Sequence, residues 1–162
     1  MDRSRTWRTT DRAATVAASA DDVWDAVASA ETGEHWYVDA FPFKFRGGLD
    51  RLSGGEGRRW PVPGKPLLEV GDHAGFWEVT EVDEVRRRLV LEAKVRAPGT
   101  VRITTDVVPG TDGTRVVQTT RLDPAGVLGW AYLLTDLPAR EVVSEWTLLH
   151  LLTEVRLRLR AA

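Results

Sequence analysis

The chain has 162 residues, of which 43% are hydrophobic and 28% charged, and its formal net charge is −2. Its length suits a single domain over residues 1–162 with its own core, and its near-neutral charge provides no basic field for nucleic acid or an anionic membrane. The absence of cysteine excludes disulfides, thiolate nucleophiles and cysteine-based zinc sites, and no apolar run is long enough for a membrane-spanning helix, so we expect a cytoplasmic protein.

The first elements along the chain are predicted to be a strand and a short helix. Residues 5–17 are rich in threonine, alanine and valine and precede a helix start signal, which favours a strand. Ser19 can accept a hydrogen bond from the amide of Asp22, so we expect it to cap a helix over residues 20–30. Apolar residues recur at helical spacing in this segment, and Gly33 is expected to end it.

Residues 34–72 lose this periodicity and combine clustered aromatic residues with many glycines. A connection of this length within one domain is usually functional or mobile, so we interpret it as a loop or lid, with a short edge strand as an option over residues 41–45. Its glycine motifs fail as nucleotide-binding loops, because Trp60 replaces the third glycine of one and Arg59 the first glycine of the other. We therefore expect no cofactor, and the three histidines are too sparse for a metal site of the zinc type.

Four segments that alternate apolar and polar residues follow, separated by short turn signals. In the third of them Val101, Ile103, Thr105 and Val107 share one face, as they would in a half-buried strand. Short turns between consecutive strands predict an antiparallel meander. The predicted strands are residues 75–82, 89–96, 101–108 and 115–122, with a hairpin loop at 109–114.

The last quarter of the chain is predicted to form a long helix. Asp123 can cap it and Pro124 suits its first position, whereas Pro138 is expected to kink the helix or force a break. Leucine and valine occupy most of its circumference, so it must be covered on more than one side. We therefore expect a sheet wrapped around this helix, with any ligand between them. A short strand over residues 155–160 is the minor alternative.

Several short motifs follow one another along the chain: Leu49-Asp50-Arg51-Leu52, Gly54-Gly55, Gly57, Gly71-Asp72, Phe76-Trp77, Pro98-Gly99, Gln118-Thr119, Pro124, Gly126, Gly129, Tyr132 and Pro138. Together with the order of elements they resemble the START-like (SRPBCC, polyketide cyclase/dehydrase-type) superfamily, whose α+β helix-grip fold wraps a curved antiparallel sheet around a long C-terminal helix. The motifs are most similar to an unannotated subgroup, a domain of unknown function often fused to NAD-binding dehydrogenase-like domains.

The resemblance implies a cavity between sheet and helix that holds an apolar or aromatic molecule, but it does not imply an activity. No dehydrogenase-like domain occurs in this sequence, so a redox role by that association would require a separate dehydrogenase partner. Three positions, Gly75, Lys94 and Arg102, depart from the family's pattern. If they line the cavity, they would change the ligand preference.

Aromatic residues are the best candidates for lining such a cavity. Each of them could instead belong to an ordinary core, and a buried tyrosine hydroxyl would need a polar partner. A histidine among the leucines of the long helix could be a hydrogen-bonded core residue or a ligand contact. The candidate ligand-binding residues are Trp36, Tyr37, Trp60, Trp77, Trp130, Tyr132, Trp146 and His150.

Three functions remain open. The preferred one is a small-molecule-binding protein that holds a hydrophobic or aromatic ligand. The alternative is a cyclase or dehydratase-type enzyme, which would need a titratable group such as His150, Asp72 or Glu78 inside the cavity. The third, a protein-interaction module, would show a filled core and an exposed apolar patch. The sequence assigns no catalytic residue and leaves the oligomeric state open.

Overall fold

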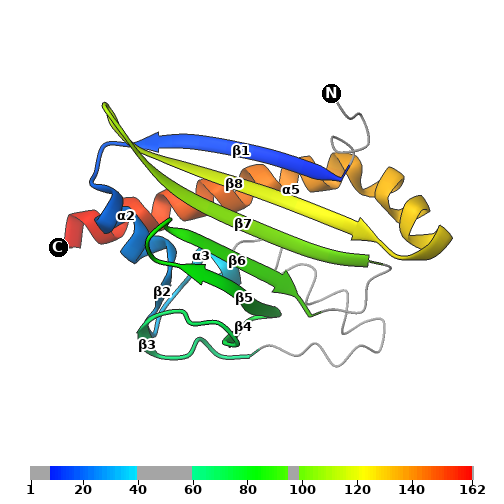
Figure 1. Ribbon diagram of the computed structural model, residues 1–162, viewed down its shortest axis with the longest axis horizontal. Coiled ribbons are helices and arrows are strands. Elements are labelled where there is room, and N and C mark those ends of the chain that lie inside the picture. Colours follow the sequence, from blue (N-terminus) through cyan, green and yellow to red (C-terminus); the bar gives the residue numbers. More distant parts are fainter. Residues whose placement is uncertain (1–7, 40–59, 95–98, 162) are drawn as a thin grey trace.

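The computed structural model describes residues 8–39, 60–94 and 99–161, and of residues 127–140 and 161 the backbone alone. A six-stranded antiparallel sheet in the order β1-β8-β7-β6-β5-β4 curves around the long helix α5 (Gly126–Ala161), as Figure 1 shows. This arrangement is the expected α+β helix-grip fold. The strands are β1 (Thr9–Val16), β4 (His73–Ala74), β5 (Trp77–Asp83), β6 (Arg88–Ala93), β7 (Gly99–Gly110) and β8 (Gly113–Pro124).

Strands β5 to β8 form the predicted antiparallel meander, and β1 pairs with β8 at the far edge. Successive side chains of a strand point to opposite faces, and here one face is buried. Ile103, Thr105 and Val107 of β7 are buried, as are Val116 and Leu122 of β8. The alternation of β7 therefore confirms the predicted face, which packs toward α5.

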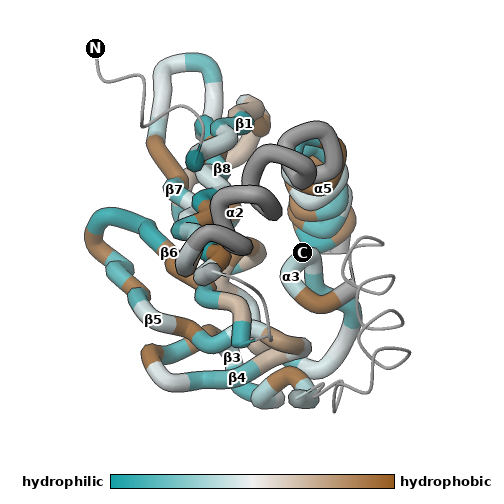
Figure 2. The backbone as a smooth tube through the Cα atoms, turned by 90° about the vertical axis from the view of Figure 1, so that its right-hand side faces the viewer, coloured by the Kyte–Doolittle hydropathy of each residue, from teal (hydrophilic) through white to brown (hydrophobic). Residues whose placement is uncertain are grey.

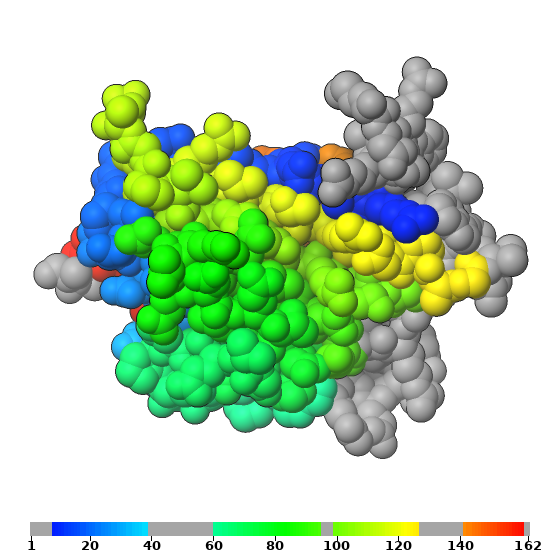
Figure 3. All heavy atoms as spheres, in the orientation of Figure 1, coloured from blue at the N-terminus to red at the C-terminus, as the bar shows by residue number. Residues whose placement is uncertain are grey.

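The outer face of the sheet carries charged side chains that pair across neighbouring strands. Arg88 of β6 lies 2.6 Å from Asp106 of β7, and Arg102 of β7 lies 2.9 Å from Glu92 of β6. Burial acts to raise the pKa of Glu92, but Lys94 and Arg102 together hold it below its ordinary value. Figure 3 shows this face, which hides most of α5 from view.

The hairpin between β7 and β8 is tighter than the predicted loop over residues 109–114. The strands stay paired as far as Gly110 and Gly113, so only Thr111 and Asp112 form the turn. Gly113 has a φ of 127°, and a Cβ built on it would collide with the backbone carbonyl oxygen of Val16. Glycine is therefore required here both for the backbone conformation and for the close approach of β1.

Helix α2 (Ala20–Val27) begins where the sequence predicts, because the side chain of Ser19 accepts a hydrogen bond from the Asp22 amide at 3.1 Å. The helix ends well before Gly33, so its predicted end was wrong. Strand β2 (Ser29–Ala30) follows at once and pairs with β3 (Lys65–Leu67) in a separate two-stranded sheet. Because residues 29 and 30 pair with this distant strand, they cannot continue the helix.

The connection after β2 contains structure that the sequence did not predict. Residues Trp36–Asp39 form the single turn α3, and Trp60 exchanges two backbone hydrogen bonds of 2.8 Å with Gly75. The edge strand considered over residues 41–45 lies outside the described residues.

Helix α5 begins at Gly126 rather than at Pro124, because Pro124 still belongs to β8 and pairs with Gly99. The helix continues through Pro138 without the predicted break, and it includes residues 155–160, so the alternative of a terminal strand was also wrong. A proline removes one backbone hydrogen bond, which a long helix sustains when packing holds the turns on either side. Within the described part of the chain, no helix has both the length and the apolarity needed to cross a membrane.

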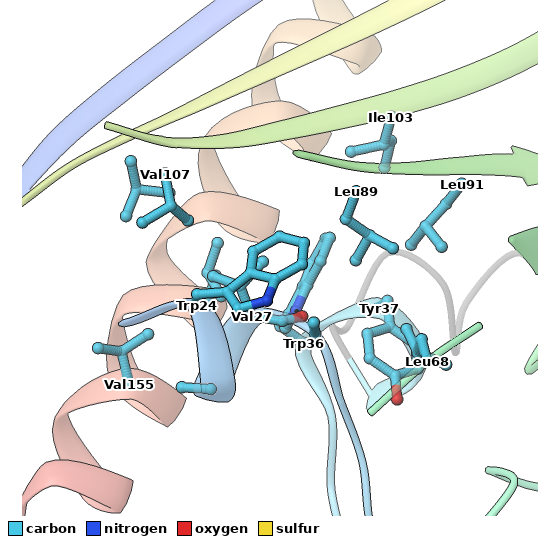
Figure 4. Packing of buried hydrophobic residues seen from close by; sticks show 14 of the residues in the cluster. Trp24, Val27, Trp36, Tyr37, Leu68, Leu89, Leu91, Ile103, Val107 and Val155 are labelled. Carbon is cyan, nitrogen blue, oxygen red and sulfur yellow. Dashed lines mark hydrogen bonds between the residues drawn. The ribbon is translucent and has the colours of Figure 1, made fainter. Parts of the chain in front are cut away.

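The apolar core lies between the sheet and the C-terminal half of α5. Figure 2 shows the strands on one side of the molecule and α5 on the other. Helix α2 contacts α5, β7 and β8, so it fills the space between the two layers. Figure 4 shows the packing of Trp24, Val27, Trp36, Tyr37 and Leu68 against Leu89, Leu91, Ile103 and Val107 of the sheet and Val155 of α5.

Candidate functional site

Four buried polar side chains meet between the sheet and α5, and we call them the interior polar cluster: Thr105, Gln118, Thr120 and Ser144. Their exposed fractions are 0%, 1%, 6% and 2%. The carboxamide nitrogen of Gln118 donates to Oγ1 of Thr105 at 3.4 Å, and Oγ of Ser144 donates to Oγ1 of Thr120 at 3.1 Å. Strands β7 and β8 and helix α5 therefore all contribute hydrogen-bonding groups to one part of the interior.

The positions of these residues follow from the alternation of the strands. Gln118 and Thr120 are two residues apart in β8, so they share the inner face with about 7 Å between them. Gln118 is directly opposite Thr105 in the register of β7 and β8, and Thr120 is opposite Ile103. The inner face of β7 and β8 therefore carries polar side chains at these positions, beside buried apolar residues of the same strands.

The buried side chain of Gln118 is only partly satisfied by hydrogen bonds. Its carboxamide oxygen Oε1 is buried and finds no hydrogen-bond partner among the residues that the structure describes. A buried acceptor without a donor costs roughly 1–3 kcal/mol relative to one that is satisfied. Within the described part of the chain, the side chain therefore leaves one strong acceptor without a donor.

At the edge of the sheet an ion-pair group connects β1 to α5. The guanidinium of Arg12 bonds Glu141 and, at 2.8 Å, Glu145, while Oγ1 of Thr10 donates to Glu141 at 2.6 Å. The hydrogen bond to Glu141 raises the pKa of Arg12 above its ordinary value. The carboxylates of Glu141 and Glu145 are therefore both paired with Arg12 at this edge of the sheet.

A second buried polar group connects α3 to the C-terminal half of α5. Nδ1 of the fully buried His35 lies 3.0 Å from Oε1 of Glu154, and its Nε2 lies 2.7 Å from the backbone oxygen of Glu31. The other carboxylate oxygen of Glu154 accepts from the Trp36 amide at 2.7 Å. Burial lowers the pKa of His35, but the hydrogen bonds to Glu154 and Glu31 raise it overall above its ordinary value.

Two of the candidate aromatic residues belong to the core, with their polar atoms bound to the backbone. Nε1 of Trp36 donates to the backbone carbonyl of Val27 at 3.0 Å, and the hydroxyl of Tyr37 donates to the backbone carbonyl of Ser29 at 2.7 Å. Both side chains are fully buried. They are therefore fixed in orientation and present their rings as rigid apolar surface.

The other candidates are spread over the molecule. Trp77 is buried on the inner face of β5, whereas Trp60 packs against His73 at a ring distance of 4.6 Å near the β4 edge. Trp146 is 51% exposed on the outward side of α5, and His150 is half-buried one turn further along. The side chains of Trp130 and Tyr132 lie outside the described residues. The structure therefore does not gather these residues around one point.

The remaining residues named from the sequence lie away from the interior. Lys94 pairs with Glu78 at 2.7 Å and with Glu92 at 3.1 Å on the outer face, where Arg102 also lies. The carboxylate of Asp72 accepts from the Glu69 amide at 2.7 Å in a turn.

The departures at Lys94 and Arg102 therefore belong to a solvent-facing ion-pair network. That network borders a groove of about 520 Å³ on the outer face of the sheet. Gly75, the third position that departs from the family's pattern, has a φ of 63° and, as a glycine, contributes no side chain to a ligand site.

Sequence reasoning missed most of the interior polar cluster. Thr105 was placed on the inner face, but Gln118 and Thr120 were not, although the alternation from Val116 to Leu122 puts both of them there. Ser144 was not among the predicted site residues. The pair of His35 and Glu154 is separated by 119 residues, and no short-range signal connects them. Among the described residues, no group of three metal-ligating side chains could hold a metal ion.

Comparison with solved structures identifies proteins of the same fold. A structural-genomics target from Nitrosospira multiformis superposes with a TM-score of 0.52 at 16% identity, covering 91% of this chain and 95% of its own. The Zhui aromatase/cyclase from Streptomyces sp. R1128 gives a TM-score of 0.46 at 17% identity over 95% and 96% of the two chains. Norcoclaurine synthase from Thalictrum flavum gives 0.40 at 20% identity over 88% and 85%.

At these identities the likeness concerns the fold alone and carries nothing about the ligand. No curated protein matches the chain. A family model described as a protein of unknown function (DUF2867) matches residues 5–145, most of the sequence. The chain therefore belongs to the DUF2867 family.

Proposed function

We propose that this protein binds a small, largely apolar molecule between the inner face of its sheet and α5. The observation that carries this proposal is the interior polar cluster, in which Ser144 of α5 bonds Thr120, Gln118 bonds Thr105, and all four side chains stay buried. Small-molecule sites in proteins are mainly apolar and contain a few polar groups that fix the orientation of the ligand.

A core that served stability alone would not need these residues. Burying a hydroxyl or an amide without full hydrogen bonding costs free energy, and apolar residues of similar size would avoid that cost. Thr105 lies between Ile103 and Val107 on the inner face of β7, so strand geometry alone does not require a polar residue there, and nothing in the alternation of β8 requires a carboxamide at Gln118. A ligand that forms hydrogen bonds with these groups would explain why polar residues occupy these buried positions.

The apolar surroundings would provide most of the affinity. Ile103 and Leu122 flank the cluster on β7 and β8, and Leu148 follows Ser144 on the buried side of α5. Burying about 200 Å² of ligand surface contributes roughly 5 kcal/mol, from which the cost of immobilising the ligand is subtracted. Each well-made hydrogen bond to the cluster would add roughly 0.5–1.5 kcal/mol.

The groups described in the cluster favour binding over catalysis. Hydroxyls and an amide hold a ligand in place, but they do not ionise near neutral pH and so are poor general acids or bases. The titratable residues considered for a cyclase lie elsewhere: Asp72 in a turn, Glu78 in an outer-face ion pair with Lys94, and His150 beside the exposed side of α5.

The test is a titration of the purified protein with aromatic polyketides and fatty acids, followed by tryptophan fluorescence and confirmed by NMR shifts. Ser144→Leu places a larger side chain in the interior and should weaken binding at least tenfold. Thr153→Leu makes the same change of residue class at an exposed position of α5 and should leave binding unchanged.

Two outcomes would contradict the proposal. One is a well-folded protein that binds none of these compounds. The other is unfolding of Ser144→Leu, detected by circular dichroism, because a filled core would not accommodate the extra side chain.

A further inference from the structure

We infer that the ligand carries a neutral hydrogen-bond donor, such as a hydroxyl group, and that Gln118 is the specificity-determining residue that accepts its hydrogen bond. This inference rests on the proposed function and adds the chemical class of the ligand. It begins from the buried carboxamide oxygen of Gln118, which has no partner among the described residues.

The neighbours of Gln118 leave its oxygen available. The register places Thr105 on one side of it and Arg12 on the other. The hydroxyl of Thr105 is the acceptor for the carboxamide nitrogen. The guanidinium of Arg12 is directed to Glu141, Glu145 and the carbonyl of Asp11. Neither neighbour therefore donates to Oε1.

The chemistry of this oxygen restricts the ligand. A carboxamide oxygen accepts hydrogen bonds and cannot donate, so a ligand carbonyl, ether or carboxylate at the same place would set two acceptors against each other. A ligand cation would require a carboxylate beside it, and the nearby Glu141 and Glu145 are bound to Arg12. A neutral alcohol or phenol on an apolar frame fits these surroundings.

The expected selectivity follows from the cost of an unsatisfied buried acceptor. A ligand that donates to Oε1 satisfies the oxygen, whereas its methyl ether fills the same space and leaves the oxygen unpaired. The difference is on the order of tenfold to a hundredfold in affinity. A purely apolar site would instead bind the more hydrophobic ether at least as tightly.

The first arm of the experiment needs no ligand and compares unfolding of the unliganded wild-type protein and the Gln118→Met variant in urea. Methionine has a similar length and no unsatisfied oxygen, so the variant should be as stable as the wild type or more stable. Thr119→Val, at the adjacent outward position, is the matched control for a change in β8. A marked loss of stability confined to Gln118→Met would show that Gln118 serves the fold and would overturn the inference.

The second arm measures affinity for the matched probes 2-naphthol and 2-methoxynaphthalene by tryptophan fluorescence. The wild type should prefer the phenol by on the order of tenfold or more, and Gln118→Met should lose this preference while still binding both probes. Thr119→Val should retain it.

The outcomes separate the two proposals. Binding of both probes with equal affinity by the wild type would leave the proposed function standing and overturn this inference, and so would a preference for the ether. Failure of both probes to bind, together with failure of the polyketides and fatty acids, would remove the proposed function and the inference with it. A crystal structure soaked with 2-naphthol that shows only a water molecule on Oε1 would also overturn the inference.

Discussion

The pair formed by His35 and Glu154 should make the stability of the fold depend on pH. Both ring nitrogens of His35 face oxygen acceptors, at 3.0 Å and 2.7 Å, and only the doubly protonated ring can donate to both. The folded protein therefore holds this proton more tightly than the unfolded chain does, consistent with the raised pKa of His35.

The direction of the effect follows from proton linkage. Below about pH 6.5 histidine is protonated in both states, and the contribution of His35 to stability is fully present. As the pH rises from there through the pKa of the folded state, the folded protein keeps a proton that the unfolded chain has lost. The free energy of unfolding then falls by up to about 1.4 kcal/mol per pH unit, and above the folded pKa the contribution is gone.

Glu154→Gln should remove most of this dependence. The new amide can still accept from the Trp36 backbone, but it presents its nitrogen or a neutral oxygen to His35 in place of a charge. Loss of a charge-assisted buried hydrogen bond costs roughly 2 kcal/mol. We expect a loss of about that size at pH 6 and a much smaller difference from the wild type at pH 8.5.

The assay is urea unfolding followed by tryptophan fluorescence between pH 5.5 and 9. His150→Gln is the matched control, since it removes a histidine from the same helix that is only half-buried. Because it leaves His35 and Glu154 in place, this variant should still lose stability as the pH rises above 6.5. The reasoning is refuted if wild-type stability does not fall above pH 6.5, or if Glu154→Gln keeps the slope of the wild type.

Three further predictions concern stability and use the same urea assay. Gly113→Ala should lower the free energy of unfolding by roughly 2–3 kcal/mol. Gly126→Ala should lower it by about 1 kcal/mol, because φ is 63° there but no described atom beyond the adjacent residues lies within 4 Å of the new Cβ. Equal costs would contradict the collision described at Gly113. Ser19→Ala should cost about 1 kcal/mol through the lost cap of α2, and a cost near zero would show that the cap is dispensable. Arg12→Gln should cost less than about 1 kcal/mol because its partner carboxylates are about half exposed, and the cost should shrink in high salt; a larger, salt-independent cost would contradict this account.

Local signals in the sequence account for most of the fold. The alternation and short turns predict the meander, and the hydroxyl of Ser19 predicts where α2 begins. The errors occur where a distant partner decides the conformation. Pro124 suits the first turn of a helix, but pairing with Gly99 holds it in β8, and pairing with β3 ends α2 early. Such pairings leave no trace in a short window of sequence.

The candidate site was predicted less well, for a similar reason. Aromatic residues attract attention as ligand contacts, yet Trp36 and Tyr37 are bound to the backbone, and the outward position of Trp146 depends on which side of α5 faces the sheet. The position of Gln118 could be predicted from alternation alone. That its oxygen has no partner among the described residues could not, because this depends on the combined geometry of β1, β7 and α5.

Helix α5 covers the β1 and β8 side of the inner face of the sheet, and it follows all the strands in the sequence. Thr9 pairs with Arg121, so the first strand also depends on one made much later. During synthesis the meander must therefore keep its apolar inner face exposed to water until α5 has been made. Contacts so distant in sequence place folding in the range of ~milliseconds to seconds, during which an uncovered sheet can associate with other chains. Truncation before α5 should therefore produce aggregation rather than a smaller folded protein.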